Sequence, residues 1–148
     1  MDHNNVLGVV LAGGKSQRFG EDKSQVKLGD KILIDYILSE IIDEFNEVLV
    51  VSNNSINFRK SKKISLIQDF KKDLGPLGGV LTAMKWVKDN NKDYQWISTF
   101  PVDTPFFKNQ ILKDFGKIHS MHTIHLKTHY SLREAQKKEN CFFLYLSI

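Results

Sequence analysis

The sequence of 148 residues has almost no cysteine and no hydrophobic run long enough to cross a bilayer. Its one cysteine, Cys141, excludes a disulfide within the chain, which favours a reducing compartment and hence a cytoplasmic location. The apolar run Val6 to Leu11 is short, lacks a basic leader and continues into a glycine-rich loop. We therefore expect neither a signal peptide nor contact with a membrane.

The sequence also lacks repeats, low-complexity tracts and linkers rich in proline or glycine. Its length and its 41% hydrophobic residues suit one compact domain. Residues 1–107 hold 14 Lys/Arg and 14 Asp/Glu, whereas residues 108–148 hold 7 Lys/Arg, 3 Asp/Glu and four of the five histidines. The net charge of +4 therefore belongs to the tail, and it does not predict a nucleic-acid-binding protein.

Short apolar segments alternate with segments of helical periodicity. Apolar residues recur at helical spacing over residues 34–45, 80–87 and 111–115, and Gly75–Gly79, just before the second of these segments, predicts a turn. Because the apolar segments between them are hydrophobic at most positions, they are typical of strands buried on both faces of a sheet. The pattern predicts an α/β fold with a mostly parallel sheet and helices on both faces. The predicted strands are Val6–Leu11, Val48–Val51, Ile64–Ile67 and Trp96–Phe100.

Each predicted strand ends in a polar or glycine-bearing segment. In an open parallel sheet, ligands bind beyond the carboxyl ends of the strands. Segments far apart in the sequence therefore converge at one edge, and we expect a binding site there. The four segments are Gly13–Lys23, Ser52–Asn54, Gln68–Asp69 and Pro101–Asp103.

The loop after the first strand has the composition of a phosphate-binding loop. Gly13 and Gly14 allow backbone N–H groups to approach an anion, while Lys15, Arg18 and Lys23 supply positive charge. Neither a Walker A loop nor a dinucleotide-binding fingerprint fits the glycine spacing. The loop by itself is also compatible with a simple glycine turn that carries solvated basic residues.

The stretch Leu11–Lys23, LAGGKSQRFGEDK, resembles the signature of nucleotidyltransferases that activate sugars or cofactors. It looks most like the molybdenum cofactor guanylyltransferase family. Three further parts of the sequence agree in order and spacing: Ser52–Asn54, then Gln68–Asp69 with Gly75–Gly79, and Pro101–Pro105. The resemblance covers about residues 5–115, and it implies a Rossmann-like, three-layer nucleotidyltransferase fold.

The resemblance also implies roles for individual residues. Asn53 and Asp69 would lie along the base and ribose, and Lys23 would meet the phosphates. Asp103 would hold Mg²⁺, and Lys23 and Arg18 would act with it in catalysis. The residues implied to bind the nucleotide are Leu11, Ala12, Gly13, Gly14, Lys15, Lys23, Asn53, Asp69, Gly78 and Gly79.

Members of the family transfer GMP from GTP to the terminal phosphate of molybdopterin carrying molybdenum, and they release pyrophosphate. The resemblance thus implies GTP and molybdopterin as substrates, with proteins that make or receive the molybdenum cofactor as partners. Two alternatives stay open: a related transferase that uses CTP, and a nucleotide-binding remnant without turnover.

Beyond about Phe115 the resemblance ends. We therefore divide the chain into a nucleotide-binding domain over residues 1–115 and an atypical basic, histidine-rich tail over residues 116–148, which is either part of the same domain or poorly packed. The family's acceptor-binding segment and its later Asn-x-Asn-Thr-Pro motif do not occur in the tail. A reading-frame change, a truncation and a divergent short form all explain this difference.

Two features of the tail have structural interpretations. Its histidines, His119, His122, His125 and His129, stand among basic residues without cysteine or carboxylate, so we do not expect a metal site there. The terminal run Phe142–Leu146 predicts either a last strand or an exposed, aggregation-prone end.

Overall fold

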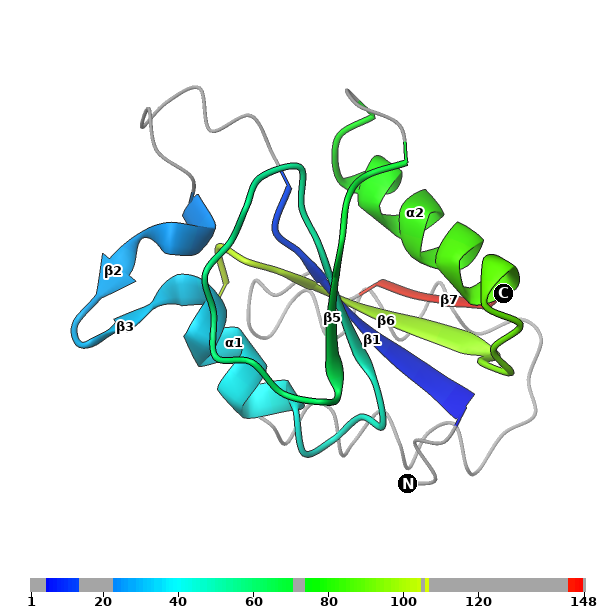
Figure 1. Ribbon diagram of the computed structural model, residues 1–148, viewed down its shortest axis with the longest axis horizontal. Coiled ribbons are helices and arrows are strands. Elements are labelled where there is room, and N and C mark those ends of the chain that lie inside the picture. Colours follow the sequence, from blue (N-terminus) through cyan, green and yellow to red (C-terminus); the bar gives the residue numbers. More distant parts are fainter. Residues whose placement is uncertain (1–4, 14–22, 71–73, 105, 107–143, 148) are drawn as a thin grey trace, which may run out of the picture.

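The computed structural model describes residues 5–13, 23–70, 74–104, 106 and 144–147. These residues form a five-stranded sheet with a helix packed on each face (Figure 1) and a separate two-stranded ribbon. The elements in chain order are β1 (Val6–Leu11), the short 3₁₀ helix η2 (Lys23–Gln25), β2 (Lys27–Leu28), β3 (Lys31–Ile32), α1 (Leu33–Ile41), β4 (Val48–Val51), β5 (Ile64–Ile67), α2 (Pro76–Asp89), β6 (Trp96–Pro101) and β7 (Leu144–Ser147).

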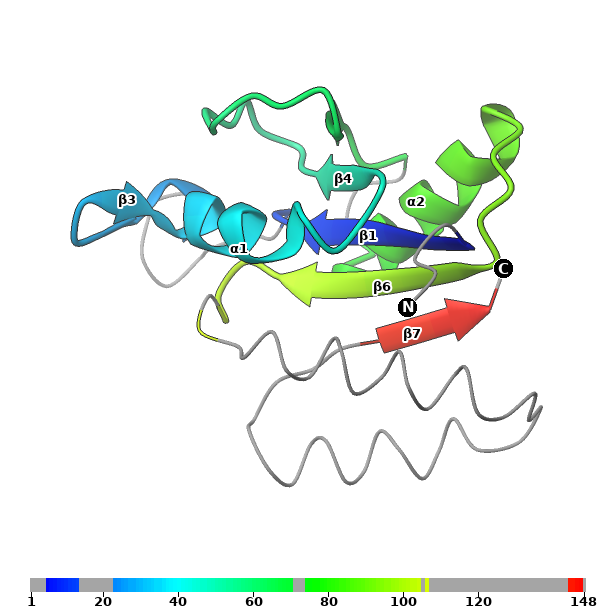
Figure 2. The ribbon, with the colours of Figure 1, turned by 90° about the horizontal axis from the view of Figure 1, so that it is seen from below.

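The strands of the large sheet follow the order β5-β4-β1-β6-β7. The first four are parallel, and β7 runs antiparallel to β6, beside which it lies in Figure 2. All four strands predicted from the sequence are present, and only the last differs, extending one residue to Pro101. The three-layer, mostly parallel α/β architecture is therefore confirmed. Of the two alternatives for the terminal run, the strand is confirmed for the described residues as β7, which extends one residue beyond the run to Ser147.

Side chains of the central strands alternate between two hydrophobic clusters. Successive residues of a strand point to opposite faces, so a strand that is apolar at every position contributes to both clusters. On one face, α1 packs against Val6, Val10, Val48 and Val50. On the other face, α2 packs against Leu7, Val9, Leu49 and Val51.

Helix α1 is shorter than its apolar pattern predicts. Its buried face is formed by Ile34, Ile37, Leu38 and Ile41, and the helix ends at Ile41 instead of continuing to residue 45. Phe45 lies beyond the helix, where its ring meets the edge of the Phe100 ring at 5.6 Å between centroids. A Cβ atom at Gly8 would lie 3.1 Å from the Phe45 ring, so the glycine lets this ring pack over β1.

Two local predictions were wrong or incomplete. Gly75–Gly79 was expected to be a turn, but Pro76 begins α2, which places the two following glycines in the first helical turn. Proline suits this position because the first helical N–H has no partner within the helix. The ribbon β2–β3 was not predicted, because its strands are only two residues long and mostly exposed. It turns at Gly29, which has a positive φ of 62°.

The predicted helix over residues 111–115 and the four histidines of the tail lie outside the described residues. Within the described part of the chain, no helix is both long and apolar enough to cross a membrane.

At the amino edge of the sheet, Glu47 connects two loops. The Oε2 atom of Glu47 accepts hydrogen bonds from Lys92 Nζ and from the Tyr94 hydroxyl, each at 2.9 Å. Burial, together with the hydrogen bond to Glu47 and its negative charge, raises the pKa of Tyr94 from 10.0 to about 12. The connection between α2 and β6 is thereby fixed to the chain just before β4.

We expect this contact to stabilise the fold in a pH-dependent way. Because the pKa of Tyr94 is higher in the folded than in the unfolded state, its contribution is complete below about pH 10 and is lost as the pH rises to about 12. Tyr94→Phe should lower the free energy of unfolding at neutral pH by about 1 kcal/mol, allowing for partial solvent exposure. Denaturant unfolding from pH 9 to 12 measures this, and an equal decline with pH in both proteins would contradict it.

Candidate functional site

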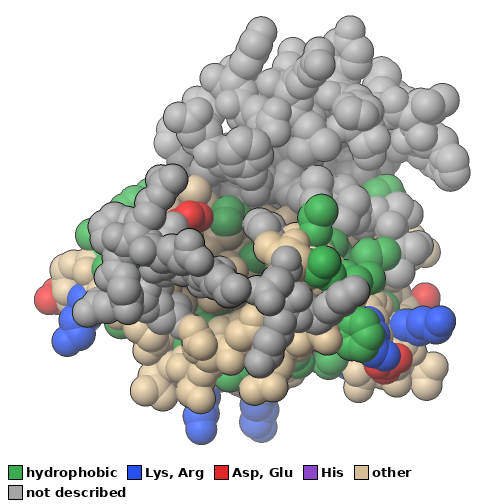
Figure 3. All heavy atoms as spheres, turned by 90° about the horizontal axis from the view of Figure 1, so that it is seen from above, with side chains coloured by type: hydrophobic (Ala, Val, Ile, Leu, Met, Phe, Trp, Pro, Cys, Tyr) green, Lys and Arg blue, Asp and Glu red, His purple; other side chains and the backbone are tan. Residues whose placement is uncertain are grey.

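The carboxyl ends of the parallel strands meet at one edge of the sheet. Figure 3 shows the molecule from above relative to Figure 1, with hydrophobic side chains exposed among backbone and uncharged polar groups. Hydrogen bonds continue just past the strand ends. Ala12 N donates to the Val51 carbonyl at 2.9 Å, and Val102 N donates to the Leu11 carbonyl at 3.3 Å. The segments that follow β1, β4 and β6 are therefore tied together by backbone contacts.

Three residues predicted from separate segments meet at this edge. Asn53 Nδ2 donates to Asp69 Oδ2 at 3.0 Å. A Cβ atom at Gly13 would lie only 3.1 Å from the same carboxylate oxygen. The absence of a side chain at Gly13 thus lets the carboxylate of Asp69 lie against the beginning of the glycine-rich loop.

The first turn of α2 closes the other side of this cluster. A Cβ atom at Gly79 would lie 2.6 Å from Leu11 Cδ2 and 3.8 Å from Asp69 Oδ1. Because a contact of 2.6 Å is far shorter than carbon atoms tolerate, a larger residue would have to displace Leu11. Glycine at this position therefore allows the helix to pack directly on the end of β1.

Thr82, which the sequence analysis did not identify, contacts three parts of the cluster. Its Oγ1 accepts the Phe70 N–H at 2.8 Å, donates to the Gly78 carbonyl at 2.8 Å and lies 3.4 Å from Asp69 Oδ1. The sequence analysis counted only apolar residues along this helix. A threonine one helical turn after a glycine pair is a signal for such a contact, since its hydroxyl can reach the carbonyl four residues earlier.

Asp103 follows β6 at the same edge, and its side chain is exposed. Thr104 donates to the Pro101 carbonyl through its N–H at 3.3 Å and its hydroxyl at 3.2 Å, so Asp103 stands in a tight turn. Among the described residues, no three His, Cys, Asp or Glu side chains gather as a metal-binding group. Magnesium is commonly held by one or two carboxylates together with substrate phosphates, and Asp103 fits this mode of binding.

The basic part of the predicted site is only partly described. Gly14, Lys15 and Arg18 lie outside the described residues. Lys23 begins η2, whose backbone contacts α1. The phosphate-binding and catalytic roles of these basic residues stay predictions.

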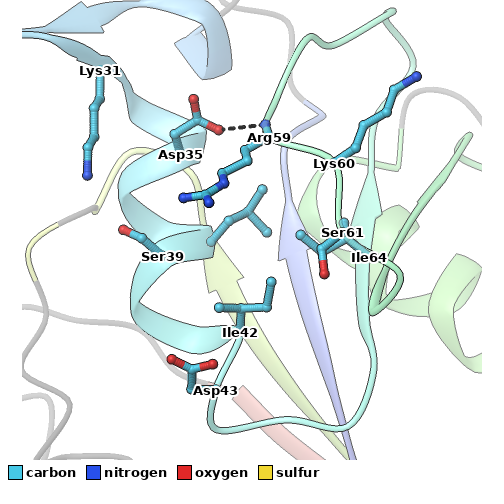
Figure 4. A pocket seen from close by; sticks show the side chains of 10 residues that line it. Lys31, Asp35, Ser39, Ile42, Asp43, Arg59, Lys60, Ser61 and Ile64 are labelled. Atoms are coloured by element: carbon cyan, nitrogen blue, oxygen red, sulfur yellow. Dashed lines mark hydrogen bonds between the residues drawn. The ribbon is translucent and has the colours of Figure 1, made fainter.

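A pocket of about 540 Å³ lies elsewhere, between α1 and the chain that leads into β5 (Figure 4). Its wall includes the Arg59 side chain, which points toward α1, and the Arg59 N–H donates to Asp35 Oδ1 at 3.0 Å. Basic and acidic side chains both line it, and none of the residues predicted to bind the nucleotide does.

The strand order and the mostly parallel pairing define a Rossmann-like α/β domain with a cluster of polar residues and glycines at its carboxyl edge. The chain belongs to the family described as the MobA-like NTP transferase domain, which matches residues 8–122.

Curated relatives of the chain carry the name probable molybdenum cofactor guanylyltransferase. The chain is 34% identical over 115 residues to a probable molybdenum cofactor guanylyltransferase of Halalkalibacterium halodurans, covering 75% of the chain and 56% of the relative. It is 34% identical over 113 residues to a protein of the same name from Natranaerobius thermophilus, covering 74% and 53%. The chain thus spans about half the length of the curated relatives it matches.

Solved structures share the fold at lower identity. Molybdopterin-guanine dinucleotide biosynthesis protein A of Archaeoglobus fulgidus superimposes with a TM-score of 0.55 at 23% identity, over 73% of this chain and 52% of that one. The 2-C-methyl-D-erythritol 4-phosphate cytidylyltransferase of Francisella tularensis gives a TM-score of 0.61 at 20% identity, over 82% and 54%.

Proposed function

We propose that this chain binds GTP with Mg²⁺ and serves the transfer of GMP from GTP to molybdopterin carrying molybdenum, with release of pyrophosphate. The observation that carries the proposal is that Gly13, Asn53 and Asp69 lie together at the carboxyl edge of the sheet. The chain belongs to the family of MobA-like NTP transferases, which supports this use of the edge. The names of the relatives support the guanylyl group and the molybdenum cofactor.

The carboxylate of Asp69 suits the proposed contact with the base and ribose. Its Oδ2 accepts one hydrogen bond from Asn53. A carboxylate offers about four acceptor positions, so capacity remains for donors of a bound nucleoside. Ribose hydroxyls and the N–H groups of a base are such donors, whereas phosphate oxygens are not. We therefore assign Asp69 to the nucleoside and the adjoining glycine-rich loop to the phosphates.

The proposed reaction requires positive charge at the phosphates more than it requires a general base. The attacking phosphate of molybdopterin is already an anion, so repulsion between anions and the charge on the departing pyrophosphate form the barrier. A magnesium ion held by Asp103 would neutralise part of this charge and help to align the phosphates. Lys15, Arg18 and Lys23 would bind and orient the triphosphate, which accelerates an in-line displacement by positioning.

The proposal predicts a preference for GTP among nucleotides. With magnesium present, the chain should bind GTP at least about tenfold more tightly than ATP, which corresponds to one well-placed polar contact with the base. Isothermal titration calorimetry with GTP, CTP and ATP measures the three affinities. Tighter binding of ATP than of GTP would refute the guanylyl assignment.

The same titration examines the alternative of a CTP-using transferase. The solved structures that share the fold include cytidylyltransferases, so the fold accommodates either base. Binding of CTP in preference to GTP would favour this alternative. We further propose a cytoplasmic location for the chain, because its single cysteine suits a reducing compartment. Proteins that make or receive the molybdenum cofactor are its proposed partners.

A further inference from the structure

Thr82 lies where three parts of the site meet. Its side chain is buried and comes from the second turn of α2. Its hydroxyl accepts the N–H of Phe70, the residue that directly follows Asp69, and it also lies 3.4 Å from Asp69 Oδ1. Thr82 therefore contacts both the backbone and the side chain of the segment in which Asp69 stands.

We infer that Thr82 is a positioning residue that holds Asp69 for the nucleotide, an inference that rests on the proposed function. The torsion that orients a carboxylate has a broad energy minimum, so one hydrogen bond does not fix it. Asn53 holds Oδ2 of Asp69, and Thr82 faces the other oxygen. The carboxylate of Asp69 thus lies between these two side chains.

The contact between Thr82 and the Phe70 N–H is the firmer part of this arrangement. A hydroxyl has one proton, so Thr82 can donate fully to only one of its two acceptors, and the Gly78 carbonyl at 2.8 Å is nearer than Asp69 Oδ1 at 3.4 Å. The bond from Phe70 N uses a lone pair and does not compete for that proton. Thr82 thus fixes the chain that follows β5 to the second turn of α2 whichever acceptor takes the proton.

Nucleotide affinity gives the first test. Thr82→Val, which removes the hydroxyl but keeps the branched shape, should weaken GTP binding about threefold to tenfold, whereas Thr82→Ser should retain it. If Thr82 acts through Asp69, Thr82→Val should cause no further loss in an Asp69→Asn background. Ser98→Ala is the matched control, because the Ser98 hydroxyl is buried in β6 and has no hydrogen-bond partner among the described residues.

Hydrogen exchange gives a second test that does not depend on GTP. In Thr82→Val the Phe70 amide and the Asn53 side-chain amide should exchange about threefold to tenfold faster, while Thr82→Ser should leave both near the wild-type rate. Thr82→Ala removes the same hydroxyl and takes the place of the valine variant if that variant does not fold.

The two tests separate the possible failures. If the wild-type chain binds no nucleotide, the proposed function fails, and the exchange rates still decide whether Thr82 positions Asp69. The inference would be overturned if the Phe70 and Asn53 amides exchanged at the wild-type rate in Thr82→Val. It would also be overturned if Thr82→Val weakened GTP binding equally in the wild-type and Asp69→Asn backgrounds. Faster exchange together with a loss that disappears in the Asp69→Asn background would support it.

Discussion

Replacing Asp103 with alanine should abolish the dependence of GTP binding on magnesium. In the wild-type chain, magnesium should strengthen GTP binding, because the ion would join the Asp103 carboxylate to phosphate oxygens. Losing one charge-assisted contact typically costs about 1.5–3 kcal/mol, which is roughly a tenfold to 100-fold loss of affinity at saturating magnesium. Calorimetric titration of GTP with magnesium or with a chelator measures the difference for each protein.

The effect should be specific to this carboxylate. Asp89→Ala is a suitable control, because Asp89 is also exposed but ends α2 at the opposite edge of the sheet, where it pairs with Lys85 at 2.7 Å. That variant should keep the wild-type response to magnesium. If magnesium strengthens GTP binding equally in Asp103→Ala and in the wild type, Asp103 is not the ligand. Because Asp103 is exposed and stands in a turn, we expect the variant to fold as the wild type does.

The sequence predicted the strands well because most of their residues are apolar on both faces. Val48–Val51, for example, contributes Val48 and Val50 to one cluster and Leu49 and Val51 to the other, and this needs a strand covered on both faces. Helix boundaries were harder to predict. The apolar periodicity of α1 continues to Phe45, yet that ring packs from a loop because Gly8 leaves space for it.

The candidate site was predicted at the level of segments, and its detail was not. Strand ends of a parallel sheet must meet, so the neighbourhood of Gly13, Asn53 and Asp69 followed from their positions in the sequence. Gly79 leaves room for the Leu11 side chain because α2 lies so close to β1. The periodicity of the sequence does not reveal this close approach. Leu81 belongs to the apolar pattern over residues 80–87, yet it is 44% exposed.

Thr82 shows a further reason why sequence patterns are incomplete. A search for hydrophobic periodicity treats a buried threonine as an interruption, whereas here its hydroxyl satisfies a backbone N–H at the end of the β5 segment. Buried polar groups require such partners, so a polar residue within an apolar face is itself a signal for a structural hydrogen bond. The sequence does not indicate which backbone group is the partner, because Phe70 is twelve residues away.

The 148-residue chain by itself should show little or no guanylyl transfer, whereas it should retain the proposed binding of GTP. The segments assigned to the nucleotide and magnesium all end before residue 106, and together they can form a nucleotide site. Transfer also needs the acceptor phosphate in line with the α-phosphate of GTP, and a misplacement of about 1 Å can cost about 100-fold in rate. The curated relatives extend to about twice the length that this chain matches, and the match to the family ends at residue 122.

A side-by-side assay of pyrophosphate release tests this expectation. The chain and the full-length guanylyltransferase of Halalkalibacterium halodurans would each receive magnesium, GTP and molybdenum-loaded molybdopterin. We expect the rate of the chain to be at least about 100-fold lower, with GTP binding retained in the calorimeter. Turnover near that of the relative, lost when residues 116–148 are removed, would contradict the expectation and would make the tail an acceptor site. Circular dichroism must accompany the shortened chain, because β7 comes from the tail and pairs with β6 over Trp96–Thr99, so its removal exposes backbone groups of that strand.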